Sequence, residues 1–147
     1  MKISIRGKNK VLTRSEIREA VIWMASLIMH PRTVETIRLT IVHEILTDDH
    51  ATLQHSLRSK FPRSFLLKLD PSGSRRQQLM TLAHELVHVK QYVRGEMRDH
   101  KYYVQWYSDR IDDEATDYWD YPWEIEARGR EYGMYRRYCD YLREQAS

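Results

Sequence analysis

His84-Glu85-Leu86-Val87-His88 is a HExxH motif in the second half of a 147-residue chain. Two histidines four residues apart on a helix project from the same face, about one turn apart. At that spacing both imidazoles can bind one Zn²⁺, and the glutamate between them can activate a water on the metal. The motif fixes only three positions and can arise by chance. It therefore carries weight only if its flanks form a helix and a third ligand follows.

The residues around the motif predict that helix. Ser74-Arg75-Arg76-Gln77 has the pattern of a capping box, which starts a helix. Gly95 supplies a stop, and Lys90 and Arg94 fall in the last turn, where cations are favourable. Apolar residues between these signals recur at helical spacing: Leu79, Leu82, Ala83, Leu86, Val87 and Val93. Both histidines therefore lie mid-helix, as a metal site requires.

The chain before the motif is expected to contain one helix and a small sheet. A capping box at Thr13–Glu16 predicts a helix that proline stops at His30-Pro31, where His30 is expected to cap rather than to bind metal. Alternation of apolar and polar residues predicts strands at Thr36–Leu46 and Phe65–Asp70. Lys2–Arg6 fits either a short strand or a frayed terminus. The polar segment Asp48–Pro62 is predicted to be a loop with solvated histidines.

The chain after the motif is expected to be irregular and then helical. Glu96–Tyr121 is rich in aromatic and acidic residues and is predicted to be a long loop packed over the body, with acidic side chains that would repel phosphates. Pro122 opens a helix that runs to about Glu144. Gly129 and Gly133 would permit close approach of another helix. The predicted inner stripe of this helix is Ile125, Gly129, Tyr132, Arg136 and Cys139.

A third metal ligand is sought in the last helix. Glu124 and Glu126 lie about 200° apart around a helix, so only one of them can face the metal. Ala127 shares the face of Glu124, and its small side chain would let this helix press against the histidine helix. That favours Glu124, with Glu126 as the alternative. Glu114 and His100 are further candidates, for which an ordinary loop position explains the residue better.

HELVH at 84–88, followed by Glu124-x-x-Ala127, resembles the gluzincin group of zinc metallopeptidases. The resemblance extends to small members called minigluzincins and to ImmA/IrrE-like intracellular or phage-type proteases. It implies an α+β fold: one minimal zincin-like metallopeptidase domain over residues 1–147, with an N-terminal helix, a small mixed sheet, the HExxH helix and a C-terminal glutamate helix. Arg128 stands where a polar residue often follows the alanine of the glutamate helix. This departure leaves open what orients the two histidines.

The resemblance also implies a mechanism. His84, His88 and Glu124 would hold Zn²⁺, and Glu85 would act as general base and then general acid in hydrolysis of a peptide bond. Tyr118 and Tyr121, beside the glutamate helix, are candidates to stabilise the oxyanion. A protein or peptide substrate would pair as an extended strand with an edge strand, for which Phe65–Leu69 is the candidate.

Composition indicates the cellular compartment of the protein and the kinds of partner it is expected to have. A lone cysteine, Cys139, excludes an intramolecular disulfide and fits a reducing compartment. The N-terminus lacks the apolar run of a signal peptide, and no segment is apolar enough to span a membrane. These features predict a cytoplasmic protein, in the host cytoplasm if it is phage-encoded. A formal charge of +3 is ordinary for a globular protein, so a nucleic-acid partner is not favoured.

Three alternatives to the peptidase hypothesis stay open. The basic pI of about 9.0 and the basic last helix are compatible with a SprT-like protease that acts on DNA-bound proteins. A non-catalytic zinc-containing interaction domain is a second alternative, although structure alone would not require Glu85. Hydrolysis of a non-peptide amide bond is the third.

Overall fold

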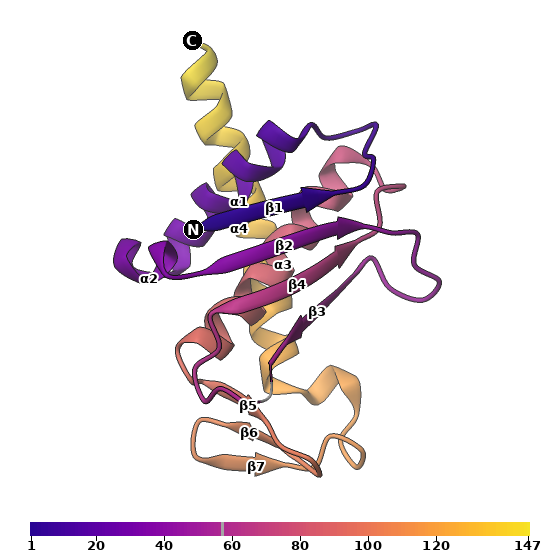
Figure 1. Cartoon of the computed structure of the whole chain (residues 1–147), viewed down its shortest axis with the longest axis vertical. Coiled ribbons are helices and arrows are strands. Elements are labelled where there is room, and N and C mark those ends of the chain that lie inside the picture. Colours follow the sequence, from indigo (N-terminus) through magenta and orange to yellow (C-terminus); the bar gives the residue numbers. More distant parts are fainter. Residues whose placement is uncertain (57) are drawn as a thin grey trace.

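A mixed four-stranded sheet forms one layer of the α+β fold seen in the computed structural model, which describes residues 1–56 and 58–147 (Figure 1). The strand order is β1-β2-β4-β3. Strands β1 (Lys2–Arg6), β2 (Arg38–His43) and β4 (Ser64–Leu69) are parallel, and β3 (Ala51–His55) runs antiparallel to β4 at the edge. The strands predicted within Thr36–Leu46 and Phe65–Asp70 are therefore confirmed as β2 and β4, and Lys2–Arg6 is a strand rather than a frayed terminus.

The edge of the sheet differs from the prediction. Strand β4 has neighbours on both sides, so the stretch around Phe65–Leu69 cannot accept a further strand. The edge strand next to β4 is β3, at the opposite side of the sheet from β1. Strand β3 lies within the segment Asp48–Pro62 that was predicted to be a loop; Leu57 of that segment lies outside the described residues. The side chain of His55, predicted to be solvated, is only 7% exposed. The five residues of β3 are too few to show a clear alternation of apolar and polar side chains. Their strand conformation depends instead on pairing with β4.

Four α-helices accompany the sheet in the part of the chain that the structure describes. Helix α1 (Arg14–Ile28) has the predicted capping box, and α2 (Pro31–Glu35) follows with the His30 side chain as its N-cap. Helix α3 (Arg75–Val93) carries the HExxH motif; Ser74 caps its first turn, and Gly95 adopts a positive φ just beyond its end. Helix α4 (Pro122–Ala146) is the last element. No helix among the described residues is long and apolar enough to cross a membrane.

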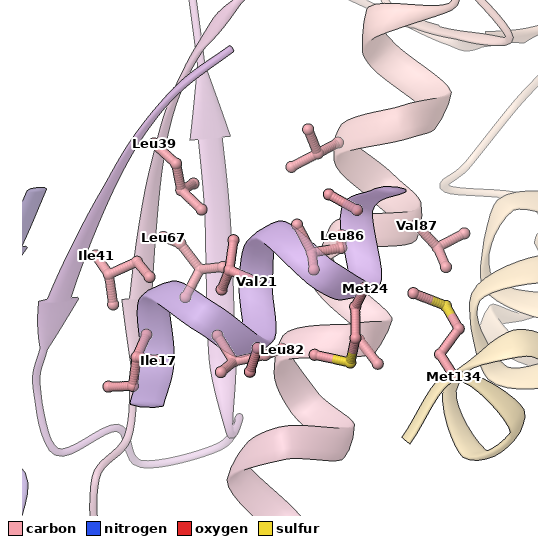
Figure 2. Close-up of a cluster of buried hydrophobic side chains, with 14 of the residues drawn as sticks. Ile17, Val21, Met24, Leu39, Ile41, Leu67, Leu82, Leu86, Val87 and Met134 are labelled. Carbon is pink, nitrogen blue, oxygen red and sulfur yellow. The ribbon is translucent and has the colours of Figure 1, made fainter. Parts of the chain in front are cut away.

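The hydrophobic core lies between the sheet and these helices. In Figure 2, Val21 of α1 points toward Leu67 of the sheet, and Met24 of α1 points toward Leu82 of α3. Burying each such side chain contributes about 1.5–3 kcal/mol. Leu86 and Val87, inside the motif, are fully buried in this core. The helical periodicity that buries these two residues places His84, Glu85 and His88 on the other side of α3, so packing in the core fixes the rotation of the helix that carries the motif.

The inner face of α4 differs from the predicted stripe. The buried residues of α4 are Trp123, Ala127, Met134 and Tyr138, whereas Ile125 and Tyr132 are 57% and 50% exposed. Among the described residues, nothing outside the helix approaches within 4 Å of a Cβ built at Gly129 or Gly133. The stripe was wrong because tyrosine and arginine occur all round this helix and obscure its period. Contacts with α3 set the rotation instead.

A second, three-stranded sheet occupies most of the segment predicted to be a long loop. It consists of β5 (Met97–Asp99), β6 (Val104–Trp106) and β7 (Asp109–Ile111), all antiparallel. A short 3₁₀ turn, η1 (Tyr118–Asp120), then leads into α4. Strands of three residues are too short for alternation to be visible in the sequence. Figure 1 places this sheet at the end of the molecule opposite the C-terminus.

Candidate metal centre

Helices α3 and α4 bring three potential ligand atoms to one point. The Nε2 atoms of His84 and His88 lie 3.1 Å apart. Each lies 3.1 Å from a carboxylate oxygen of Glu124, His84 from Oε2 and His88 from Oε1. The three residues thus form the cluster that the HExxH spacing and the Glu124-x-x-Ala127 pattern predicted. Ala127 is fully buried, which lets α4 approach α3 closely at this level.

The geometry of the cluster fits a small cation. Bonds of about 2.0–2.1 Å in a tetrahedral site place neighbouring ligand atoms about 3.3 Å apart. The observed 3.1 Å separations lie close to that value. Two imidazoles and one carboxylate would occupy three corners and leave the fourth open. This donor set is typical of catalytic rather than structural zinc sites.

The outer nitrogen of each histidine is held by an acceptor. The Nδ1 atom of His84 donates to Glu131 Oε2 at 2.9 Å, and the Nδ1 atom of His88 donates to Gln91 Oε1 at 2.8 Å. These bonds place the proton of each neutral ring on Nδ1 and leave the Nε2 lone pairs directed at the cluster. Glu131 and Gln91 therefore supply the orientation that the Arg128 departure had left open.

Glu131 and Gln91 were not predicted to hold the histidines, although their spacing from the ligands offered a signal. Glu131 follows Glu124 by seven residues and Gln91 follows His88 by three, so each shares a helix face with a ligand. Gln91 is fully buried, and its Nε2 group donates to the Trp123 carbonyl at 3.0 Å and to Glu126 Oε1 at 2.9 Å. Its amide is thus fixed from α4.

Charge in the cluster also favours a cation. Burial lowers the pKa of His84, but the carboxylates of Glu124 and Glu131 outweigh it and raise that pKa to about 9. Burial raises the pKa of Glu124, and hydrogen bonds from both histidines outweigh it, so this carboxyl stays ionised well below its usual range. Positive charge at the three ligand atoms is therefore strongly stabilised, whether protons or a metal ion supply it.

The other candidate ligands lie elsewhere. Glu126 accepts from Lys90 at 2.6 Å and from Gln91, and it is not one of the three residues of the cluster. His100 stacks on Tyr103 and contacts Gln105, and Glu114 is exposed in the loop before η1. The structure therefore places Glu124, and not these residues, beside the two histidines.

Glu85 lies beside the cluster in an open cavity of about 870 Å³. Its side chain is mostly buried, and burial raises the pKa of its carboxyl. No described residue hydrogen-bonds to it, so both oxygens are available to a water or substrate in the cavity. A carboxylate in this state suits proton transfer near neutral pH.

The two candidate tyrosines are placed differently. The hydroxyl of Tyr118 lines the cavity, donates to Glu124 Oε2 at 3.1 Å and accepts from Arg128 Nη2 at 2.9 Å. The ring of Tyr121 stacks on Trp123, and its hydroxyl donates to the Asp113 carbonyl. The structure thus brings Tyr118 to the cluster and does not bring Tyr121 there.

Removing either outer partner is expected to weaken metal binding. Loss of such a partner typically costs 10–100-fold in affinity because the ligating ring is no longer held in its tautomer and orientation. We expect Gln91→Ala and Glu131→Ala each to lower zinc affinity by about that factor, measured by competition with a chromophoric chelator. Gln105→Ala, on the second sheet, is the matched control. Unchanged affinity in both test variants would contradict the assigned roles.

Comparisons with protein-family models, curated proteins and solved structures found no match to this chain. Functional assignment therefore depends on the geometry of the site.

Proposed function

We propose that this protein is a zinc-dependent metallopeptidase. The observation that carries the proposal is the set of 3.1 Å separations between the Nε2 atoms of His84 and His88 and between each of them and a carboxylate oxygen of Glu124. Beside them lies Glu85, whose carboxylate has no hydrogen-bond partner among the described residues, in an open cavity. A structural site would need no open coordination position and no buried carboxylate next to it. Both features are expected of a site that carries out hydrolysis.

Zinc is the metal that this donor set suits best, because two imidazoles and a carboxylate match its ligand preferences. Bound there, zinc would polarise the scissile carbonyl and lower the pKa of a coordinated water toward neutrality. Glu85 would take a proton from the water as its oxygen attacks the carbonyl carbon. Glu85 would then deliver that proton to the amine nitrogen as the carbon–nitrogen bond breaks.

Tyr118 would stabilise the negative charge that develops on the carbonyl oxygen. Arg128 donates to the Tyr118 oxygen and stacks over its ring, which holds the hydroxyl at the cavity. Its proton, donated to Glu124 Oε2 in this structure, would turn to the carbonyl oxygen once Glu124 binds the metal. Such a donor, placed in advance, stabilises the transition state more than the substrate.

Tyr118→Phe is expected to lower kcat by about 10²–10³-fold, with little change in KM, because one oxyanion donor is lost. Tyr121→Phe is the matched variant and is expected to retain kcat, since its hydroxyl bonds the loop backbone. The measurement is steady-state kinetics of peptide hydrolysis with zinc content checked for each variant. A kcat loss in Tyr121→Phe alone would reverse the two assignments.

An extended peptide could pair with β3. This strand is one of the two edges of the sheet, and its residues Ala51, Thr52 and Leu53 line the cavity. Its free backbone groups would hold a substrate strand through main-chain hydrogen bonds, a common mode of peptide recognition. A cytoplasmic setting remains part of the proposal, since the lone Cys139 fits a reducing compartment.

The direct test uses purified protein and a mixture of peptides of varied sequence. We expect cleavage by the zinc-loaded protein, no cleavage after a chelator removes the metal, and recovery when zinc is returned. Mass spectrometry of the products identifies the cleaved bonds. Zinc-loaded protein that cleaves none of the peptides, under conditions where zinc binding is verified, would contradict the proposal.

A further inference from the structure

One wall of the cavity comes from the second sheet. Met97 and Asp99 are two residues apart on β5 and so face the same side, and Val104 of β6 is paired directly with Asp99. All three line the cavity together with Tyr92 and Trp123. Met97, Val104 and Trp123 are almost fully buried and pack together as a small apolar cluster. We call these five residues the hairpin wall. It places a single carboxylate in an otherwise apolar or aromatic surface.

Asp99 is held rigidly by only one of its two oxygens. The Tyr92 hydroxyl donates to Oδ2 at 2.8 Å, and Nε2 of His55 lies 3.1 Å from the same atom. No described residue hydrogen-bonds to Oδ1, and the side chain is 32% exposed. Burial and the charge of Asp99 raise the pKa of Tyr92, so this phenol remains a neutral donor. Asp99 therefore presents a fixed, free carboxylate oxygen at the cavity.

This arrangement matches a long basic side chain. The alkyl stem of lysine or arginine can pack against Met97, Val104 and Trp123, while its cationic end pairs with Asp99 Oδ1. A neutral apolar side chain would bury the Oδ1 atom of Asp99 without a hydrogen-bond partner, which is unfavourable. An acidic side chain would be repelled. The hairpin wall thus discriminates among substrate side chains by their charge as well as by their shape.

We propose that Asp99 is a specificity-determining residue that selects peptides with a lysine or arginine side chain next to the scissile bond. This inference rests on the proposed peptidase function. Strand β3 runs toward the hairpin wall, because His55 at its end contacts Asp99. A substrate strand antiparallel to β3 therefore enters with its N-terminal part at that wall. The basic residue then precedes the scissile bond.

The test compares peptides that differ at one position. Each peptide carries lysine, arginine, norleucine or glutamate before the cleaved bond, and kcat/KM is measured with zinc-loaded wild type and Asp99→Asn. We expect wild type to prefer lysine over norleucine by about ten- to a hundredfold, the range for a hydrogen bond to a charged group. Asp99→Asn keeps an acceptor for Tyr92 and is expected to lose that preference while still cleaving the norleucine peptide. Asp109→Asn, an exposed β7 residue with the same charge change, is expected to keep it.

Binding gives a second readout that needs no turnover. Fluorescence anisotropy on Glu85→Gln should show tighter binding of the lysine peptide than of the norleucine peptide, and Glu85→Gln/Asp99→Asn should not. Equal cleavage and equal binding of the two peptides by protein with intact Asp99 would overturn the proposal without any variant of that residue. Selective binding without cleavage by wild type would instead support Asp99 and contradict the peptidase function, so the two failures are distinguishable.

Discussion

Glu85→Gln is expected to abolish measurable peptide cleavage while leaving zinc bound. General acid–base catalysis contributes about 10²–10⁴-fold, and we expect kcat to fall by at least that factor. Glutamine has the same shape but cannot accept a proton, so packing around the mostly buried side chain is retained. The three ligand atoms do not include Glu85, so the metal affinity should change little.

The measurement pairs steady-state kinetics with zinc content on the same samples. Glu96→Gln is a useful control, because Glu96 is about as buried as Glu85 but pairs with Lys90 rather than lining the cavity. We expect it to alter stability more than kcat. If Glu85→Gln retained wild-type kcat, the assigned mechanism would be wrong even with zinc in place.

Glu124→Ala is expected to remove the metal and, with it, the activity. Glu124 contacts both histidines through separate oxygens, so its loss removes one of three ligands and the negative charge that favours a cation. We expect the loss of zinc affinity to exceed the roughly 100-fold upper range for an outer partner. Excess zinc should therefore raise the Tm of wild type and not that of the variant.

Glu126→Ala is the control that shows whether any loss of zinc binding is specific to Glu124 or follows from substitution of a glutamate in α4 generally. Both glutamates lie in the first two turns of α4, but Glu126 pairs with Lys90 and Gln91 instead of the cluster. We expect its loss to weaken zinc binding only through Gln91, by about 10–100-fold. A larger loss in Glu126→Ala than in Glu124→Ala would show that the third ligand had been misassigned.

Much of the site could be predicted because it depends on local helical geometry. The HExxH spacing, the caps of α1 and α3, and the small Ala127 beside Glu124 each act within one or two turns. These signals were enough to choose Glu124 over Glu126. The outer partners Gln91 and Glu131 were missed because polar residues on an exposed-looking helix face carry no apolar period.

The remaining differences come from non-local pairing. The conformation of β3 depends on β4, which is about ten residues away, and strands β5–β7 are each three residues long. Neither feature leaves a period in the sequence. Helix α4 was predicted in the right place but with the wrong buried face, since its rotation is set by α3. The edge strand and the hairpin wall therefore emerged only from the three-dimensional arrangement.

Zinc K-edge X-ray absorption of the reconstituted protein tests the central claim most directly. The proposal predicts one zinc per chain, with two imidazole nitrogens at about 2.0–2.1 Å, further oxygen ligands and no sulfur. His84→Ala should remove one imidazole from that spectrum. A wild-type protein that binds no zinc, or a zinc bound through the sulfur of Cys139, would contradict the metal centre and the function proposed from it.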